Sequence, residues 1–128
     1  MLNKLRTRLE GDEGFTLIEL LVVIIILGIL MAIAIPSYLG FKDRANKSAA
    51  QANVRSSVPG IEAYAADNNG YTGITLAKLQ ASYDAGIKNI AFSATAPTAT
   101  TYCISSTVGA YTFFKNGPGA DILLGTCP

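Results

Sequence analysis

Histidine and tryptophan are absent from this chain, and only two of its 128 residues are cysteine. Histidine is the commonest general base and metal-ligating side chain in proteins, so its absence removes the usual centre of acid–base and metal chemistry. The serines have no partner base, and the sequence has neither a glycine-rich phosphate motif nor a zinc-ligand spacing. We therefore expect a protein that is not an enzyme and that uses no cofactor or metal.

An excess of charge of either sign is also missing, because ten basic and nine acidic side chains leave a formal net charge of +1. This balance argues against nucleic acid or an anionic surface as the main partner. The length allows one small domain, and an apolar first third leaves a soluble part of about 90 residues. A core of that size buries little surface, so a covalent cross-link within the domain would add to its stability.

The strongest signal is the apolar run over residues 15–35, which is interrupted by a single charged side chain, Glu19. As a helix it would be about 31 Å long, which matches the hydrocarbon core of a membrane. Its continuity, without a polar stripe, favours a membrane helix over a buried helix of a soluble protein. Gly14 stands directly before the run, whereas an ordinary secretory signal has its small-residue cleavage site after it. Cutting at Gly14 would remove residues 1–14 and leave the apolar segment in the mature chain.

Glu19 is the anomaly of this segment, because a carboxylate in a membrane helix costs about 2.5–3.5 kcal/mol. In one interpretation Glu19 lies near the membrane interface and reaches water. In the other it pairs with a cation, and cutting after Gly14 would create one in the α-amine of Phe15. Such a pair between two chains could fix the axial register of packed helices. We favour the second interpretation.

Residues 14–20, followed by the apolar run and Pro36, resemble the N-terminus of proteins with a class III signal peptide, the type IV pilins and pseudopilins. The resemblance in detail covers residues 11–38, and the rest of the chain matches in general plan only. It implies that a prepilin peptidase cuts after Gly14 and methylates the new amine of Phe15.

The same resemblance assigns roles to three further positions. It implies that Glu19 pairs with the Phe15 amine of a neighbouring subunit during assembly. Gly28 and Pro36 match positions that bracket a stretch of helix which loses its helical form in assembled pili. Glycine is a weak helix former and proline removes a backbone donor, so the two residues suit that role.

Cys103 and Cys127 are an even pair in a small domain, which beyond a membrane indicates one disulfide. The closed loop of about 25 residues would be worth about 3 kcal/mol. The basic residues on the two sides of the apolar run nearly balance, so they do not decide its orientation. The predicted disulfide decides the orientation, and it places the C-terminal domain outside the cytoplasm.

Residues 36–67 continue the helix with an amphipathic pattern, and Pro59 is expected to bend it or break it locally. Residues 68–128 are predicted to form a globular part with loops and a sheet. Thr75 could cap a short helix, and residues 93–101 are read as a loop or an edge strand. The predicted short helix covers residues 76–81, and the predicted strands cover residues 102–105, 111–114 and 122–124.

The sequence thus predicts an α+β fold, in which a long N-terminal helix packs through its amphipathic half on a small C-terminal antiparallel sheet, as in pilins. The resemblance implies the major subunit of a type IV pilus, used for adhesion, motility or DNA uptake. The precursor would cross the inner membrane once, with the C-terminal domain outside, and would assemble into an extracellular helical filament of identical subunits. Its partners would be the membrane, the prepilin peptidase, the pilus assembly platform and minor pilins, with nucleic acid contacted only through the filament.

Two alternatives remain from the sequence. A pseudopilin of a type II secretion or competence system would share the N-terminal motif. Pseudopilins often carry a calcium site made of C-terminal carboxylates, and this chain offers only Asp121 there. A monomeric membrane-anchored binding domain would need neither the boundary at Gly14 nor Glu19, so it is the weaker alternative.

Overall fold

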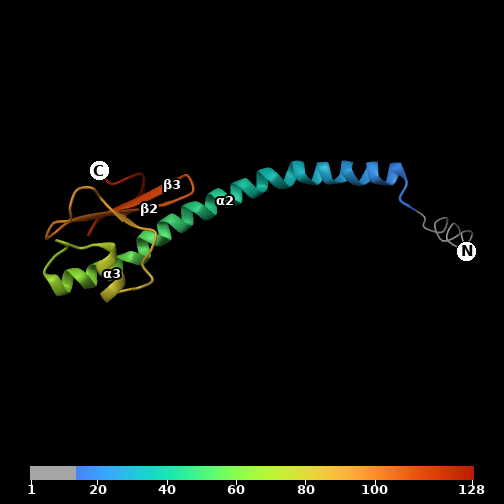
Figure 1. Ribbon diagram of the computed structural model, residues 1–128. Coiled ribbons are helices and arrows are strands. Elements are labelled where there is room, and N and C mark those ends of the chain that lie inside the picture. Colours follow the sequence, from blue (N-terminus) through green and yellow to red (C-terminus); the bar gives the residue numbers. More distant parts are fainter. Residues whose placement is uncertain (1–13) are drawn as a thin grey trace, which may run out of the picture. The chain divides into compact units, whose positions relative to one another are not determined.

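The computed structural model describes residues 14–128, so all but the last residue of the predicted leader lies outside the described residues. The described elements are, in chain order, α2 (Leu17–Asn68), α3 (Leu76–Ser82), β1 (Ala91–Phe92), β2 (Tyr102–Val108), β3 (Tyr111–Gly117) and β4 (Ile122–Leu124) (Figure 1). The chain forms two compact units, one ending at Leu39 and the other beginning at Gly40, and α2 contributes to both. A long helix followed by a small antiparallel sheet confirms the predicted α+β fold.

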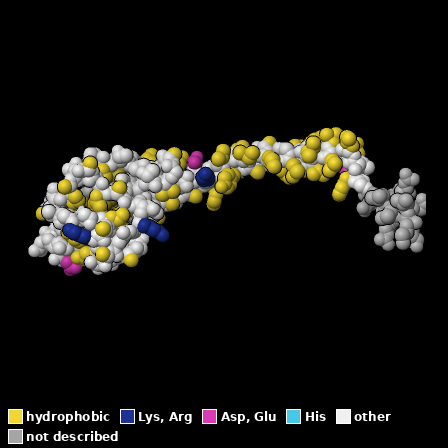
Figure 2. Space-filling model, in the orientation of Figure 1, with side chains coloured by type: hydrophobic (Ala, Val, Ile, Leu, Met, Phe, Trp, Pro, Cys, Tyr) yellow, Lys and Arg dark blue, Asp and Glu magenta, His cyan; other side chains and the backbone are white. Residues whose placement is uncertain are grey.

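The N-terminal unit consists, in its described part, of the first half of α2 and the three residues before it. Every large apolar side chain from Phe15 to Leu39 is between 46% and 84% exposed. Figure 2 shows these hydrophobic side chains along the helix. A helix that is apolar all round and uncovered needs an apolar environment, supplied either by a membrane or by other helices.

The second half of α2 belongs to the C-terminal unit and buries one face against it. The buried residues recur three or four positions apart, as expected for an amphipathic helix, and they are Ala50, Val54, Ser57, Gly60, Ile61 and Tyr64. The helix continues through Pro59 without a break, so of the two expected outcomes the local break is wrong and the bend stays a prediction. Pro59 is exposed and removes only the helical hydrogen bond to the carbonyl of Arg55, which the helix on either side tolerates.

The sheet has the order β1-β2-β3-β4, and all neighbouring strands are antiparallel. Strands β2 and β3 form a hairpin from the Tyr102↔Gly117 pair to the Val108↔Tyr111 pair, and Figure 1 shows them side by side. The three predicted strands are present, two of them longer than predicted. Residues 93–101 are a loop, and the edge strand lies just before them at Ala91–Phe92, where the sequence analysis placed no strand.

The core of the C-terminal unit joins α2 to α3 and the sheet. Its largest fully buried apolar side chains come from four segments and are Val54, Ile61, Leu79, Ile87 and Ile104. Alternate residues of β2 point into it, as the period of a strand requires. Helix α3 begins where predicted, because the Thr75 side chain accepts a hydrogen bond from the backbone N–H of Lys78 at 3.3 Å.

The disulfide predicted from the sequence is present. Cys103 on β2 is bonded to Cys127, which follows β4, and their Cα atoms are 5.9 Å apart. The bond therefore ties the C-terminal segment to the central hairpin of the sheet.

Candidate functional site

The start of α2 carries two reciprocal hydrogen bonds between Thr16 and Glu19. The Thr16 hydroxyl accepts a hydrogen bond from the Glu19 backbone N–H at 3.3 Å, and Glu19 Oε2 accepts one from the Thr16 backbone N–H at 2.9 Å. The Thr16 carbonyl accepts the first helical hydrogen bond from Leu20 at 3.2 Å. This arrangement is a capping box, in which two backbone donors that a helix start leaves unpaired are satisfied by side chains.

The capping box gives Glu19 a role within its own chain that the sequence analysis missed. The signal was readable, because Thr-x-x-Glu directly before an apolar run is the sequence signature of this motif. A carboxylate in the first turn is also favoured by the helix dipole. Only Oε2 of Glu19 takes part in these bonds, so Oε1 is free to accept a hydrogen bond from a cation.

Gly14 and Phe15 precede the helix in exposed, non-helical chain. No atom outside its immediate neighbours lies within 4 Å of a Cβ built on Gly14, and Phe15 is 83% exposed. A proteolytic enzyme needs an accessible, non-helical segment of this kind. The structure thus brings the predicted cleavage position, the predicted methylation position and Glu19 together at one helix start.

Gly28 and Pro36 lie in the continuous part of α2, and the helix shows no interruption between them. Pro36 leaves the Ala32 carbonyl without its helical partner, and the Ser37 hydroxyl donates to the Ile33 carbonyl at 3.2 Å. The loss of helix expected for this stretch concerns assembled subunits, so it stays a prediction.

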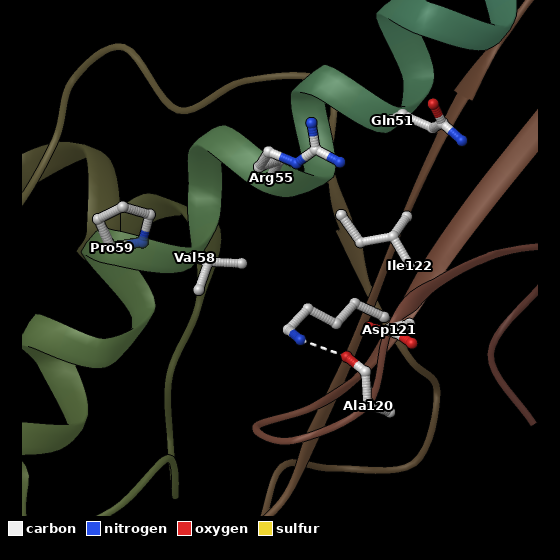
Figure 3. A pocket seen from close by; sticks show the side chains of 8 residues that line it. Gln51, Arg55, Val58, Pro59, Ala120, Asp121 and Ile122 are labelled. Atoms are coloured by element: carbon white, nitrogen blue, oxygen red, sulfur yellow. Dashed lines mark hydrogen bonds between the residues drawn. The ribbon is translucent and has the colours of Figure 1, made fainter.

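The C-terminal unit holds a groove of about 540 Å³ between the second half of α2 and the segment around the β3–β4 connection (Figure 3). Residues of α2 line one side of the groove, and residues of β3, β4 and their connection line the other. Together they are Gln51, Arg55, Val58, Pro59, Lys115, Ala120, Asp121 and Ile122. Lys115 Nζ donates a hydrogen bond to the Ala120 carbonyl across the end of the groove. No pattern in the sequence predicted this groove, because its two sides come from segments about 60 positions apart.

Two tyrosine rings, those of Tyr71 and Tyr102, pack together in the core of the C-terminal unit. The Tyr71 hydroxyl donates to both carboxylate oxygens of Glu62, at 2.9 and 3.1 Å, and its ring centroid is 4.7 Å from that of Tyr102. Burial, followed by the hydrogen bond to Glu62, raises the pKa of Tyr71. Burial, followed by the charge of Glu62, raises the pKa of Tyr102, whose hydroxyl is buried without a hydrogen-bond partner. The raised pKa values keep both hydroxyls protonated further into the alkaline range, which suits a packing role.

Within residues 14–128, no three acidic or cysteine side chains are grouped so that they could hold a metal ion. Asp121, the C-terminal carboxylate singled out above, lies in the groove beside Lys115. Helix α2 is long and apolar enough to cross a membrane, by length and composition.

The comparison with known proteins agrees with the N-terminal geometry. Residues 11–35 match the family described as "Prokaryotic N-terminal methylation motif". That match spans the predicted cleavage position, the capping box and the whole apolar run.

Similarity to individual proteins extends beyond the motif. The type IV wide pilus major component PilA4 of Thermus thermophilus is 38% identical over 96 residues, which cover 75% of this chain and 73% of the relative. The type II secretion system core protein G of Pectobacterium carotovorum is 40% identical over 60 residues, which cover 47% of this chain and 38% of the relative. The type IV major pilin protein PilA of Myxococcus xanthus is 38% identical over 61 residues, which cover 48% of this chain and 28% of the relative. The similarity in the first of these comparisons spans most of both chains, and the N-terminal methylation motif is present as well. The protein therefore belongs to the type IV pilin and prepilin-like family.

Proposed function

We propose that this chain is the major structural subunit of a type IV pilus. The observation that carries the proposal is the extent of its similarity to a pilus major component, 96 residues, against 60 residues for a secretion-system core protein. The family is structural, and the described residues offer no arrangement of nucleophile and base that would suggest catalysis.

Processing begins with the cut between Gly14 and Phe15 by a prepilin peptidase, which then methylates the Phe15 amine. The exposed segment before α2 supports this step, because a peptidase must bind it in extended form. After the cut, the chain begins one residue before the capping box, so the box itself survives processing.

Assembly then places the apolar half of α2 among the same segments of other copies. The Phe15 ammonium of one subunit pairs with Glu19 of its neighbour, and the free Oε1 of Glu19 supports this pairing. Since Oε2 is already held by the Thr16 backbone N–H, the carboxylate is oriented before the partner arrives. An oriented acceptor loses less side-chain entropy when it binds.

The location follows from the same features. The precursor spans the inner membrane once, with the C-terminal unit outside the cytoplasm, and the disulfide between Cys103 and Cys127 supports this orientation. In the filament the sheet domains form the outer layer, so adhesion, motility or DNA uptake depends on the polymer. The assembly platform, minor pilins and any nucleic acid meet the subunit in that context.

The second candidate is a pseudopilin of a type II secretion or competence system, and the 40% identity to a secretion-system core protein favours it. The two functions share the N-terminal chemistry and differ in the product, which is a long surface filament for a pilin.

Deletion of the gene and complementation separates the two candidates. Electron microscopy should show that the deletion strain lacks surface filaments and that the complemented strain regains them, while the set of secreted proteins is unchanged. Filaments that persist together with a loss of secreted proteins would favour the pseudopilin and overturn the proposal.

A further inference from the structure

The charges on the second half of α2 are separated along its axis. Residues 40–58 contain four cations and one carboxylate, whereas residues 59–68 contain two carboxylates and no cation. Three of the cations, Arg44, Lys47 and Arg55, fall within an arc of about 80° when each residue advances about 100° around the helix. We call these three residues the basic side of α2.

Within the part of the chain that the structure describes, the basic side has no acidic partner in its own subunit. Between Gly40 and Pro128, no Lys or Arg forms an ion pair with a carboxylate, and Arg44 and Arg55 are exposed. Lys47 packs its ammonium 4.7 Å from the ring centroid of Tyr111. Arg55 lines the groove of Figure 3, where Lys115 adds a second cation and Asp121 the one carboxylate. The guanidinium of arginine presents a fork of donors that fits a carboxylate, so a carboxylate is the natural ligand of this surface.

The acidic end of α2 offers a carboxylate of this kind in Asp67. Asp67 is exposed, and its Oδ2 accepts a hydrogen bond from the Tyr83 hydroxyl at 3.1 Å. A neutral hydroxyl orients the carboxylate and leaves its negative charge in place. Glu62, the other carboxylate of this end, is instead held through both oxygens by Tyr71.

Helix geometry prevents Asp67 from meeting the basic side within one subunit. Asp67 lies about 18 Å from Arg55 and about 35 Å from Arg44 along the axis, and it points about 120° away from Arg55 around it. Two complementary surfaces that face different directions on one subunit suit a heterologous contact, in which each surface binds the other surface of the next copy. Such a contact repeats from copy to copy and can build an open filament instead of a closed ring.

We propose that the basic side of α2 in one copy of this chain receives Asp67 of a second copy. The inference rests on the proposed function, because it requires parallel copies displaced along a filament axis by about 18–35 Å. The contact joins the sheet-bearing halves of the subunits, separately from the contact between Phe15 and Glu19. The contact favours the axial displacement at which opposite charges meet. It disfavours displacements that would place like charges next to each other.

Charge reversal in the full-length chain, expressed as the sole copy, tests the contact. Arg44→Glu with Arg55→Glu should lower the number of surface filaments about tenfold, since like charges would then face each other. Adding Asp67→Lys to this double variant should restore filaments to within about threefold of the wild type. Lys47 is left unchanged because it packs on Tyr111.

Two controls separate the contact from general effects. Lys42→Glu with Lys88→Glu changes the net charge by the same amount at two exposed positions outside the basic side, and it should leave filament numbers unchanged. Asp67→Asn removes the charge but keeps an oxygen for the Tyr83 hydroxyl, and it should lower filament numbers without lowering subunit levels in the membrane.

Filaments at wild-type numbers in the Arg44→Glu, Arg55→Glu variant would overturn the inference, and so would a failure of Asp67→Lys to restore them. An equal loss in the Lys42→Glu, Lys88→Glu control would also overturn it. Absence of filaments from the wild-type strain would instead overturn the proposed function, so the two failures are distinguishable.

Discussion

Thr16 and Glu19 each accept a hydrogen bond from the other's backbone N–H, at 3.3 Å through the hydroxyl and at 2.9 Å through the carboxylate. The charge in the apolar segment is therefore part of the helix start before any second subunit is present. This lowers the cost of keeping Glu19 there, since a hydrogen-bonded carboxylate at a helix N-terminus is better satisfied than an isolated one. In the proposed assembly, the same bond would hold the carboxylate ready to accept the Phe15 amine of a neighbour.

Replacement of Glu19 distinguishes a filament subunit from a simple membrane anchor. Glu19→Leu removes an insertion cost of about 2.5–3.5 kcal/mol, so an anchor would gain from it. A filament subunit should instead assemble less well, because leaving the Phe15 ammonium buried and unpaired costs about 3–5 kcal/mol. We expect the variant to be processed, to reach normal membrane levels by immunoblot, and to form few or no filaments by microscopy. Wild-type filament numbers would refute the pairing.

Replacement of Thr16 should have a smaller effect through the same motif. Thr16→Ala keeps the Glu19 carboxylate and its bond to the Thr16 backbone N–H but removes the capping hydroxyl, at a cost of about 1 kcal/mol. Filament numbers should fall between those of the wild type and Glu19→Leu. Thr16→Ser, which retains a hydroxyl, is the matched control and should match the wild type. A loss in Thr16→Ala as complete as in Glu19→Leu would contradict this ranking.

Loss of the disulfide should destabilise the C-terminal unit. Cys127→Ser opens a loop closed over a sequence separation of 24, and removal of a native disulfide from a small domain costs about 2–5 kcal/mol. Chemical denaturation of the full chain in detergent measures the loss, and non-reducing peptide mapping of the wild type should recover the two cysteines as one linked species. Recovery of both cysteines as free thiols in the mature wild type would contradict the assignment.

Gly117 should not tolerate a side chain. A Cβ on Gly117 would lie 2.2 Å from Tyr102 Cζ, so Gly117→Ala must displace a buried ring, and overpacking of this kind costs about 1–3 kcal/mol. Gly119→Ala is the matched control, because no atom outside its neighbours lies within 4 Å of its Cβ. Denaturation midpoints should fall for the first variant and stay near the wild type for the second. Equal midpoints would show that the ring does not pack on Gly117.

The buried Tyr102 hydroxyl should make stability depend on pH in the alkaline range. Its pKa in the folded chain is raised above the ordinary value of 10.0, so its contribution is present below pH 10 and is lost as pH rises above it. Tyr102→Phe removes a buried hydroxyl that has no hydrogen-bond partner, so it should raise the free energy of unfolding at pH 8 by about 1–3 kcal/mol. Between pH 10 and pH 11 the variant should lose less stability than the wild type. A steeper loss in the variant would contradict this.

Local patterns in the sequence predicted most of the helices and strands, whereas the roles predicted for the N-terminal site stay predictions. The apolar run and the amphipathic pattern gave α2 to within two residues at each end, and the two cysteines allowed one pairing. The two-residue strand β1 could not be predicted, because it is too short to show a period and depends on pairing with Ser105 and Ile104.

Contacts between distant segments account for what the sequence could not predict. The closeness of Tyr102 to Gly117 depends on the register of β2 against β3, which no local pattern fixes. The groove at Arg55 likewise needs the sheet to be placed against α2. Thr16 is a different case. Its capping-box motif, Thr-x-x-Glu, was present in the sequence, but it was not recognised as the start of the helix.

The most direct measurement is the intact mass of the main protein in surface filaments that have been sheared from wild-type cells. If this chain is the processed filament subunit, the mass corresponds to residues 15–128 with one methyl group on the Phe15 amine and one disulfide between Cys103 and Cys127. A filament protein that still carries residues 1–14, or filaments in which this chain is absent, would contradict the account.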